Sequence, residues 1–231
     1  MSYGNEQERL LRVMADNLKL PLVKIARGAE LSAISQERTD LLEDISQTAN
    51  MAIRLIDSYL LSLHINTVPN LELEPVSLPL VAHEVLHGLS GLAQQYDCDL
   101  EIDIEAVCRP VITHRNSLES ALSIVGQSII ESASNSEKRG KVVFGLHKNN
   151  KGLVAGIYGN GQLGSLDLKR GRVLFGSAQQ PVGELLSHSG GRLFIADSLL
   201  SSMNTTLKVL RHRNMIGLGA TLLPSHQLRL V

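Results

Sequence analysis

Two stretches of this sequence contain residues whose types and spacing could support catalysis or metal binding. One of them is His83-Glu84-x-x-His87. On a helix, residues four apart share a face, so both imidazoles could bind Zn²⁺ while Glu84 polarises an attacking water. A zinc hydrolase also needs a third ligand, and Ser90 stands where the longer form of the motif has glycine. We therefore treat a zinc hydrolase as a less favoured hypothesis and expect no metal site.

The other stretch is residues 14–22, which read Met-Ala-Asp-Asn-Leu-Lys-Leu-Pro-Leu. Asp16 could in principle form an acyl phosphate, as a carboxylate nucleophile does. Its neighbour Asn17 is no base, and no cluster of acidic residues that would hold Mg²⁺ surrounds it in the sequence. We expect Asp16 to be a solvated side chain on the outer face of a helix.

Glycines cluster at two later places, and at the second of them the backbone could approach an anion. Gly159 and Gly161 follow an alternating apolar stretch, and Gly190 and Gly191 precede an apolar one. A glycine-rich turn in front of a helix can cradle phosphates with its amides. It can equally be a flexible turn without a ligand, and the residues alone leave both readings open.

The composition excludes several classes of function. The chain has 231 residues and a formal net charge of −1, so no global charge attracts nucleic acid or an anionic membrane. Aromatic residues make up only 3%, which disfavours base-stacking surfaces. No segment approaches the roughly 18 apolar residues of a membrane span, so we expect a cytoplasmic protein. We expect Cys98 and Cys108 to be small buried residues rather than a disulfide framework.

The N-terminal quarter of the chain predicts two long helices. Apolar residues recur at spacings of three and four in both, and the second follows a seven-residue repeat. These residues are Leu11, Met14, Leu18, Leu22, Ile25 and Ala29 in the first helix, and Leu42, Ile45, Ala49, Ala52, Ile56, Tyr59 and Leu63 in the second. A polar turn near residues 32–37 joins them into a hairpin. A second copy would complete a four-helix bundle, so we expect a homodimer.

The rest of the chain alternates between helical and strand patterns. A proline-containing linker with a short strand at 71–75 comes first, and a helix at 116–133 is expected to be capped by Asn116 or Ser117. Two alternating stretches flank a tight turn at 148–152, which predicts a hairpin of strands. The further expected elements are helices at 80–96 and 193–203, and strands at 100–104, 107–113, 206–211 and 219–223. This order predicts an α+β sandwich of two layers with mostly antiparallel strands.

The stretch from residue 14 to residue 22 resembles the phosphoacceptor box of bacterial histidine kinases with its histidine missing. Leu18, Lys19, Pro21 and Leu22 fit the box, and Asp16 occupies the histidine position. The order of elements resembles the same family, in which a dimerising hairpin precedes a sandwich domain that holds ATP. The resemblance covers nearly the whole chain.

The resemblance also implies which chemistry this chain lacks. Asn17 stands where the family has the acidic neighbour of the histidine. Leu20 stands where the family has a threonine or asparagine that resembles the water-positioning residue for dephosphorylating a partner. The scaffold of the box is therefore present without its reactive side chains.

The nucleotide pocket implied by the resemblance is altered in the same way. The stretch beginning at Gln127 matches the family's first nucleotide helix and places Glu131 at the position of the Mg²⁺-coordinating asparagine. Gly159 stands where an aspartate accepts a hydrogen bond from adenine, and Gly161 follows it. The glycine pair before residue 192 retains part of the late phosphate-binding turn. We expect neither ATP nor Mg²⁺ to bind as a cofactor.

We therefore predict a degenerate histidine kinase core that is not an active enzyme. The expected parts are a dimerisation hairpin at 1–66, a linker at 67–79 and an ATPase-like α/β sandwich at 80–231. The expected function is that of a dimeric, non-catalytic regulatory module in two-component signal transduction, with a response regulator or a kinase as partner. The alternative is a diverged kinase or phosphotransferase that uses Asp16 or a histidine elsewhere as its acceptor.

Overall fold

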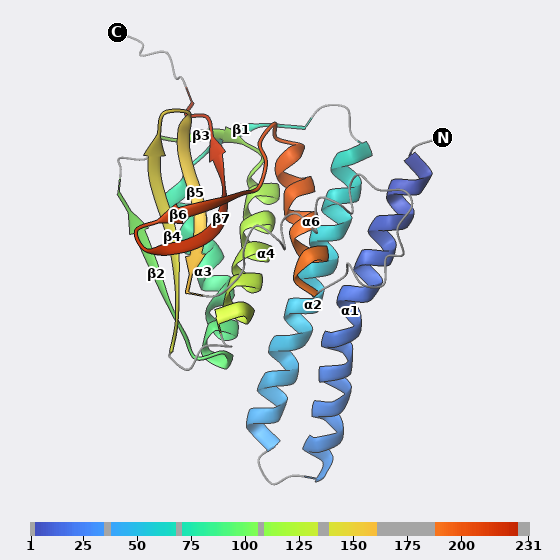
Figure 1. Cartoon of the computed structure of the whole chain (residues 1–231). Coiled ribbons are helices and arrows are strands. Elements are labelled where there is room, and N and C mark those ends of the chain that lie inside the picture. The colour runs from blue at the N-terminus through green and yellow to red at the C-terminus, as the bar shows by residue number, and fades with distance from the viewer. Residues whose placement is uncertain are drawn as a thin grey trace.

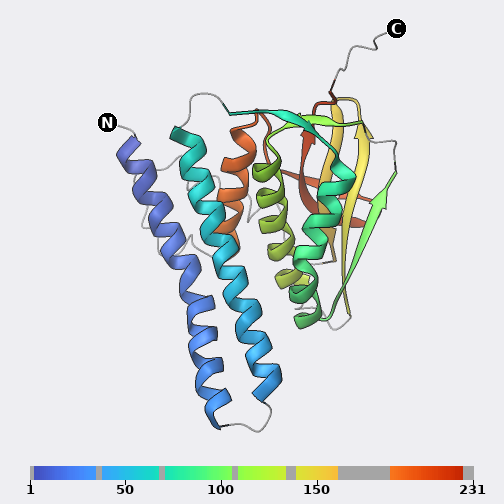
Figure 2. The same ribbon diagram turned by 180° about the vertical axis from the view of Figure 1, so that it is seen from behind.

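The structure is a computed structural model, and it describes residues 3–34, 38–67, 71–105, 109–133, 139–160 and 188–225. Helices form one layer and a twisted sheet forms the other (Figure 1). Seen from behind, α1, α2, α6, α4 and α3 stand in a row (Figure 2). The predicted two-layer α+β architecture is confirmed.

The hairpin consists of α1, Tyr3–Ile34, and α2, Arg38–Thr67. Helix α1 continues through Pro21, which is buried. Of the predicted apolar face of α1, Met14 and Leu18 pack against the core, and Leu11 and Leu22 are 56% and 57% exposed in the single chain. The buried side also carries Asn17 and Ser32, two polar residues that a pattern of apolar spacing cannot identify.

Ten shorter elements follow the hairpin in the part of the chain that the structure describes. They are β1 Glu74–Val76, α3 Leu78–Gln95, β2 Cys98–Ile104, β3 Val111–Thr113, α4 Arg115–Ala133, β4 Gly140–Asn149, β5 Gly152–Gly159, α6 His188–Ser201, β6 Lys208–His212 and β7 Met215–Leu222.

The main sheet has five strands in the order β2-β4-β5-β7-β6, and β1 pairs with β3 in a separate small sheet. Strand β2 runs parallel to β4, and the other neighbours are antiparallel. The predicted β4–β5 hairpin is correct, with both strands longer than expected. The helix-facing residues of β4 and β5, such as Phe144 and Ile157, are fully buried. The core therefore lies between the sheet and α3, α4 and α6.

The hairpin and the sandwich share this core. Leu55, Tyr59 and Ile65 of α2 belong to the same buried cluster as the sheet and its helices. The hydroxyl groups of Ser62 on α2 and Ser198 on α6 lie 3.2 Å apart in a buried hydrogen bond. The division into parts at residues 66 and 79 stays a prediction.

Several local expectations differ from the structure. Helix α4 is capped by His114, whose Nδ1 lies 2.7 Å from the Ser117 hydroxyl and accepts from the Ser117 amide at 3.3 Å. The expected caps, Asn116 and Ser117, lie inside the helix. A histidine can cap because its unprotonated ring nitrogen accepts as a serine oxygen does, although serine and asparagine are more common there.

Strand β1 begins at Glu74, three residues after the predicted start at residue 71. Cys98 is buried as expected, and Cys108 lies outside the described residues. No helix among the described residues combines the length and the hydropathy that crossing a membrane requires.

Candidate functional site

The structure places the phosphoacceptor-like box in the middle of α1, beside α2. Asn17 is 3% exposed, and its Nδ2 donates a hydrogen bond of 2.8 Å to the hydroxyl of Tyr59. The amide thus joins the two helices from within the hairpin. Leu20 is 39% exposed, and Asp16 lies on α1 with its side chain outside the described part of the structure.

This environment does not suit Asn17 for proton transfer. A carboxamide neither takes up nor releases a proton near neutral pH, so it cannot replace an acidic neighbour of a nucleophile. Its buried position beside Tyr59, which is 1% exposed, fits a structural contact between helices. Asn17, the residue next to Asp16, therefore contributes to the packing of α1 against α2.

The expected metal position on α4 is engaged in an ion pair. Glu131 Oε1 lies 2.6 Å from Nη1 of Arg192, which comes from the first turns of α6. The Arg192 side chain is 5% exposed and the Glu131 side chain 25%. A carboxylate that neutralises a buried guanidinium is a poor ligand for Mg²⁺, because releasing it would leave the guanidinium buried and unpaired. Gln127, one turn earlier on α4, is buried at 5% exposure.

The glycine positions do not form the expected turn. Helix α6 begins at His188, so Gly190 and Gly191 lie in its first turn and not in a loop before it. The expectation of a glycine turn preceding the helix is wrong, because packing of the apolar residues that follow outweighs the low helix propensity of glycine. Gly159 ends β5, is buried and has no side chain to contact a base, and Gly161 lies outside the described residues.

The His-Glu-x-x-His motif lies on an exposed side of α3. His83, Glu84 and His87 are all exposed. Both carboxylate oxygens of Glu84 accept hydrogen bonds of 2.7 Å from Nη2 of Arg115 on α4, which lowers the pKa of Glu84. Within the described part of the chain, the one group of three potential metal ligands lies elsewhere, and it includes neither histidine of this motif.

A polar cavity of about 250 Å³ lies between α2, α3 and α4. Its lining carries acidic groups, one arginine and three serines: Arg54, Asp57, Ser58, Glu84, Val85, Glu119, Ser120 and Ser123. Burial raises the pKa of Glu119, and Arg115 opposes that rise. None of the positions named from the kinase resemblance lines this cavity.

Comparison with known proteins identifies the fold. No protein-family model and no curated protein matches the amino-acid sequence. The solved structure of the histidine kinase AdeS of Acinetobacter baumannii matches with a TM-score of 0.53 at 14% identity, over 91% of this chain and 98% of that chain. The chain has the fold of a histidine kinase core.

Two further structures match this histidine kinase core fold. The histidine kinase ThkA, solved in complex with the response regulator protein TrrA, matches with a TM-score of 0.55 at 14% identity, over 95% of this chain and 61% of that chain. A structure of a bacterial phosphotransferase matches with a TM-score of 0.51 at 11% identity, over 95% of this chain and 97% of that chain. At these identities the likeness concerns the fold alone.

The sequence did not predict the partner of Glu131. Arg192 directly follows the glycine pair at 190 and 191. A charged residue directly before the apolar residues Leu193, Phe194 and Ile195 is a signal of a buried ion pair. The pairing itself depends on how α6 packs against α4, 61 residues away in sequence.

Proposed function

We propose that this chain is a non-catalytic binding module of two-component signalling, built on a histidine kinase core fold. The observation that carries this proposal is the Glu131–Arg192 ion pair. It neutralises the side chain at the position where the kinase resemblance implies a Mg²⁺ ligand. Gly159 supports the same conclusion, since it offers no carboxylate to adenine.

The module acts as a homodimer formed by residues 1–66. Large apolar residues on the hairpin remain between 49% and 60% exposed: Leu11, Leu22, Val23, Leu31, Leu42, Ile53 and Leu60. Exposed leucines in such numbers on two adjacent helices are a surface that association would bury. A second hairpin packed on them would give a four-helix bundle.

Its partner is a response regulator or a kinase that docks on the hairpin. ThkA, a kinase with this fold, has been solved in complex with a response regulator protein. Docking of that kind needs a matching surface and no phosphate transfer, so it is compatible with the altered residues of this chain. The cellular location we propose is the cytoplasm, where these partners act.

A phosphotransferase is the second candidate. The bacterial phosphotransferase structure and this chain match each other over nearly their full lengths. Such an activity would not need the nucleotide site, but it needs an acceptor side chain, either Asp16 or a histidine elsewhere. Labelling therefore has to be tried both with ATP and with a phosphorylated response regulator as donor.

The decisive test is incubation of the purified chain with labelled ATP and Mg²⁺, and separately with labelled phospho-regulator. We expect no label on the chain from either donor. If the phospho-regulator alone labelled the chain, and Asp16→Asn abolished that label, the chain would be a phosphotransferase and not a binding module. Label from ATP would contradict both.

The dimer is tested by light scattering of the full chain. Wild type is expected at twice the monomer mass, and Leu22→Glu with Ile53→Glu is expected to give monomers, because both side chains are more than half exposed in the single chain. Ser46→Glu, at another exposed position of α2, is the control and should remain dimeric. A monomeric wild type would contradict the proposal.

A further inference from the structure

The outer side of the main sheet, away from the helices, brings its two edge strands together. Strands β2 and β6 are at opposite ends of the strand order, yet His212 at the end of β6 reaches Asp103 of β2. Their Nε2 and Oδ2 atoms lie 2.8 Å apart. The β6–β7 end folds across the sheet to make this possible (Figure 1).

Glycines on the outer side provide the room for this closure. A Cβ atom at Gly145 would lie 2.8 Å from Cε2 of Tyr158 and 3.3 Å from Cδ2 of His212. A Cβ atom at Gly217 would meet the backbone carbonyl of Ile157. Side chains at these two positions would keep the β6–β7 end away from β4 and β5.

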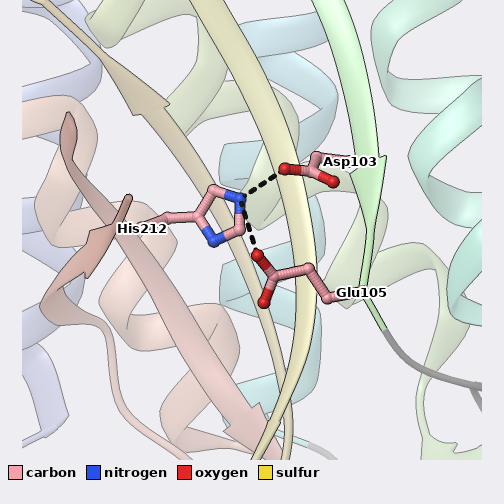
Figure 3. A group of neighbouring side chains, drawn as sticks. All are labelled: Asp103, Glu105 and His212. Carbon is pink, nitrogen blue, oxygen red and sulfur yellow. Dashed lines mark hydrogen bonds and ion pairs between the residues drawn. The ribbon is translucent and has the colours of Figure 1, made fainter. Parts of the chain in front are cut away.

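Three potential metal ligands converge where the edges meet. The donor atoms of Asp103, Glu105 and His212 all lie within 4.8 Å of one another. Both carboxylates point toward the same imidazole nitrogen, and Glu105 Oε1 lies 3.9 Å from it (Figure 3). His212 is buried at 3% exposure, whereas Asp103 and Glu105 are 20% and 45% exposed, so the group opens to the surface on one side.

Among the described side chains at this group, negative charges outnumber positive ones. Two carboxylates face one arginine, Arg213, whose Nη2 lies 2.6 Å from Oδ2 of Asp103 and whose Nε lies 3.9 Å from Oε1 of Glu105. The Arg213 side chain is 66% exposed, so it can turn into water when a cation takes its place. One imidazole nitrogen and two carboxylate oxygens suit Zn²⁺ and similar transition-metal ions better than Mg²⁺ or Ca²⁺.

A second observation points to a ligand at the same place. The Tyr158 residue is fully buried, and its hydroxyl has no hydrogen-bond partner among the described residues. Nδ1 of His147 is likewise buried without a partner within the described ranges. Their rings surround His212, with centroids 5.0 Å and 5.4 Å from its own.

The Tyr158 phenol is influenced by the charge of this group. Burial is the main cause that raises the pKa of the phenol, and the negative charge of Glu105 raises it further. A buried hydroxyl without a partner destabilises the fold, so a polar group of this kind needs an explanation. A water or anion on a bound metal ion would give it an acceptor.

We propose that Asp103, Glu105 and His212 bind one divalent transition-metal ion, with Zn²⁺ as the best fit. The ion ties the two edge strands of the sheet together across its outer side. The rings of Tyr158 and His147 pack around His212 beside this site. This proposal is independent of the signalling function, since none of these residues belongs to the kinase-like positions.

Calorimetry and thermal unfolding of the full chain test the proposal, after EDTA treatment and removal of the chelator. We expect stoichiometric Zn²⁺ binding, a higher Tm with Zn²⁺, and much weaker binding of Mg²⁺. Asp103→Asn and Glu105→Gln are expected to weaken Zn²⁺ binding by about tenfold or more each, and the exposed Glu105 position keeps at least one variant folded.

Two control variants locate the ion. Glu101→Gln removes another exposed carboxylate of β2 and should leave Zn²⁺ binding unchanged. His83→Ala with His87→Ala removes the α3 motif and should also leave it unchanged. Absence of Zn²⁺ binding, Mg²⁺ binding as tight as Zn²⁺ binding, or binding that is lost only in the α3 variant would each overturn the proposal.

Discussion

The helix side and the outer side of the main sheet differ in how their charges are balanced. On the helix side, Glu131 meets one buried guanidinium, that of Arg192, at 2.6 Å. On the outer side, two carboxylates converge on one imidazole, and their arginine is largely exposed. The first arrangement is a buried ion pair in which the carboxylate is already neutralised, and the second can accept a further cation.

The two sides therefore differ in whether their carboxylates are free to bind a further cation. The kinase resemblance implies nucleotide chemistry on the helix side. There the carboxylate of Glu131 forms an ion pair with the buried Arg192. The resemblance implies nothing for the outer side, where the Tyr158 hydroxyl and Nδ1 of His147 are buried without a partner among the described residues. Retention of a fold therefore does not tell which of its surfaces carries function.

The largest expected effect comes from Glu131→Gln. The substitution leaves Arg192, which is 4% exposed, without its counter-charge. Breaking a buried ion pair in this way costs about 3–5 kcal/mol. Urea unfolding measures the loss, and Glu101→Gln is the matched control, because its pair with Lys141 is exposed and contributes less than about 1 kcal/mol.

Adding Arg192→Met to Glu131→Gln is expected to recover most of that stability, since no buried charge then remains. The recovery separates a broken ion pair from a general packing defect. The contradicting result is that Glu131→Gln lowers the free energy of unfolding by no more than Glu101→Gln does. In that case the Glu131 carboxylate would not stabilise the fold, and it could bind a cation as the carboxylates of the outer side can.

A smaller effect is expected from removing one buried hydroxyl on each side. Tyr59→Phe removes the acceptor of Asn17 and should lower the free energy of unfolding by about 1–2 kcal/mol. Tyr158→Phe in metal-free protein should instead raise it by about 1–2 kcal/mol, because the substitution removes a buried hydroxyl that has no partner among the described residues. Equal losses in urea unfolding would remove the distinction between the two sides.

The smallest effect concerns Cys98, a thiol at the start of β2 whose pKa burial raises above the ordinary value of 9.0. A folded pKa above the unfolded one gives stability that is present below pH 9 and lost as pH rises through the folded value. Urea midpoints between about pH 8 and 10 should therefore fall less steeply in Cys98→Ala. An unchanged slope would mean that the thiol titrates normally.

Local patterns in the sequence predicted most of the fold. The seven-residue repeat identified α2, and alternation around residues 148–152 identified the β4–β5 hairpin. Features that depend on distant contacts could not be predicted in this way. The parallel pairing of β2 with β4 and the burial of Asn17 against Tyr59 follow from tertiary packing.

The candidate sites show the same limit. Positions 16, 131 and 159 were found because a local motif frames each of them. Asp103 and His212 are 109 residues apart and share no motif, so only the curled sheet brings them together. The pairing of Glu131 with Arg192 was missed for the same reason.

We propose that this chain keeps a histidine kinase core fold without the nucleotide chemistry. The most direct test is calorimetric titration of the full chain with ATP and Mg²⁺, on a sample whose dimeric state has been checked. We expect no heat of binding beyond dilution. A saturable, stoichiometric isotherm in the wild-type chain would contradict it.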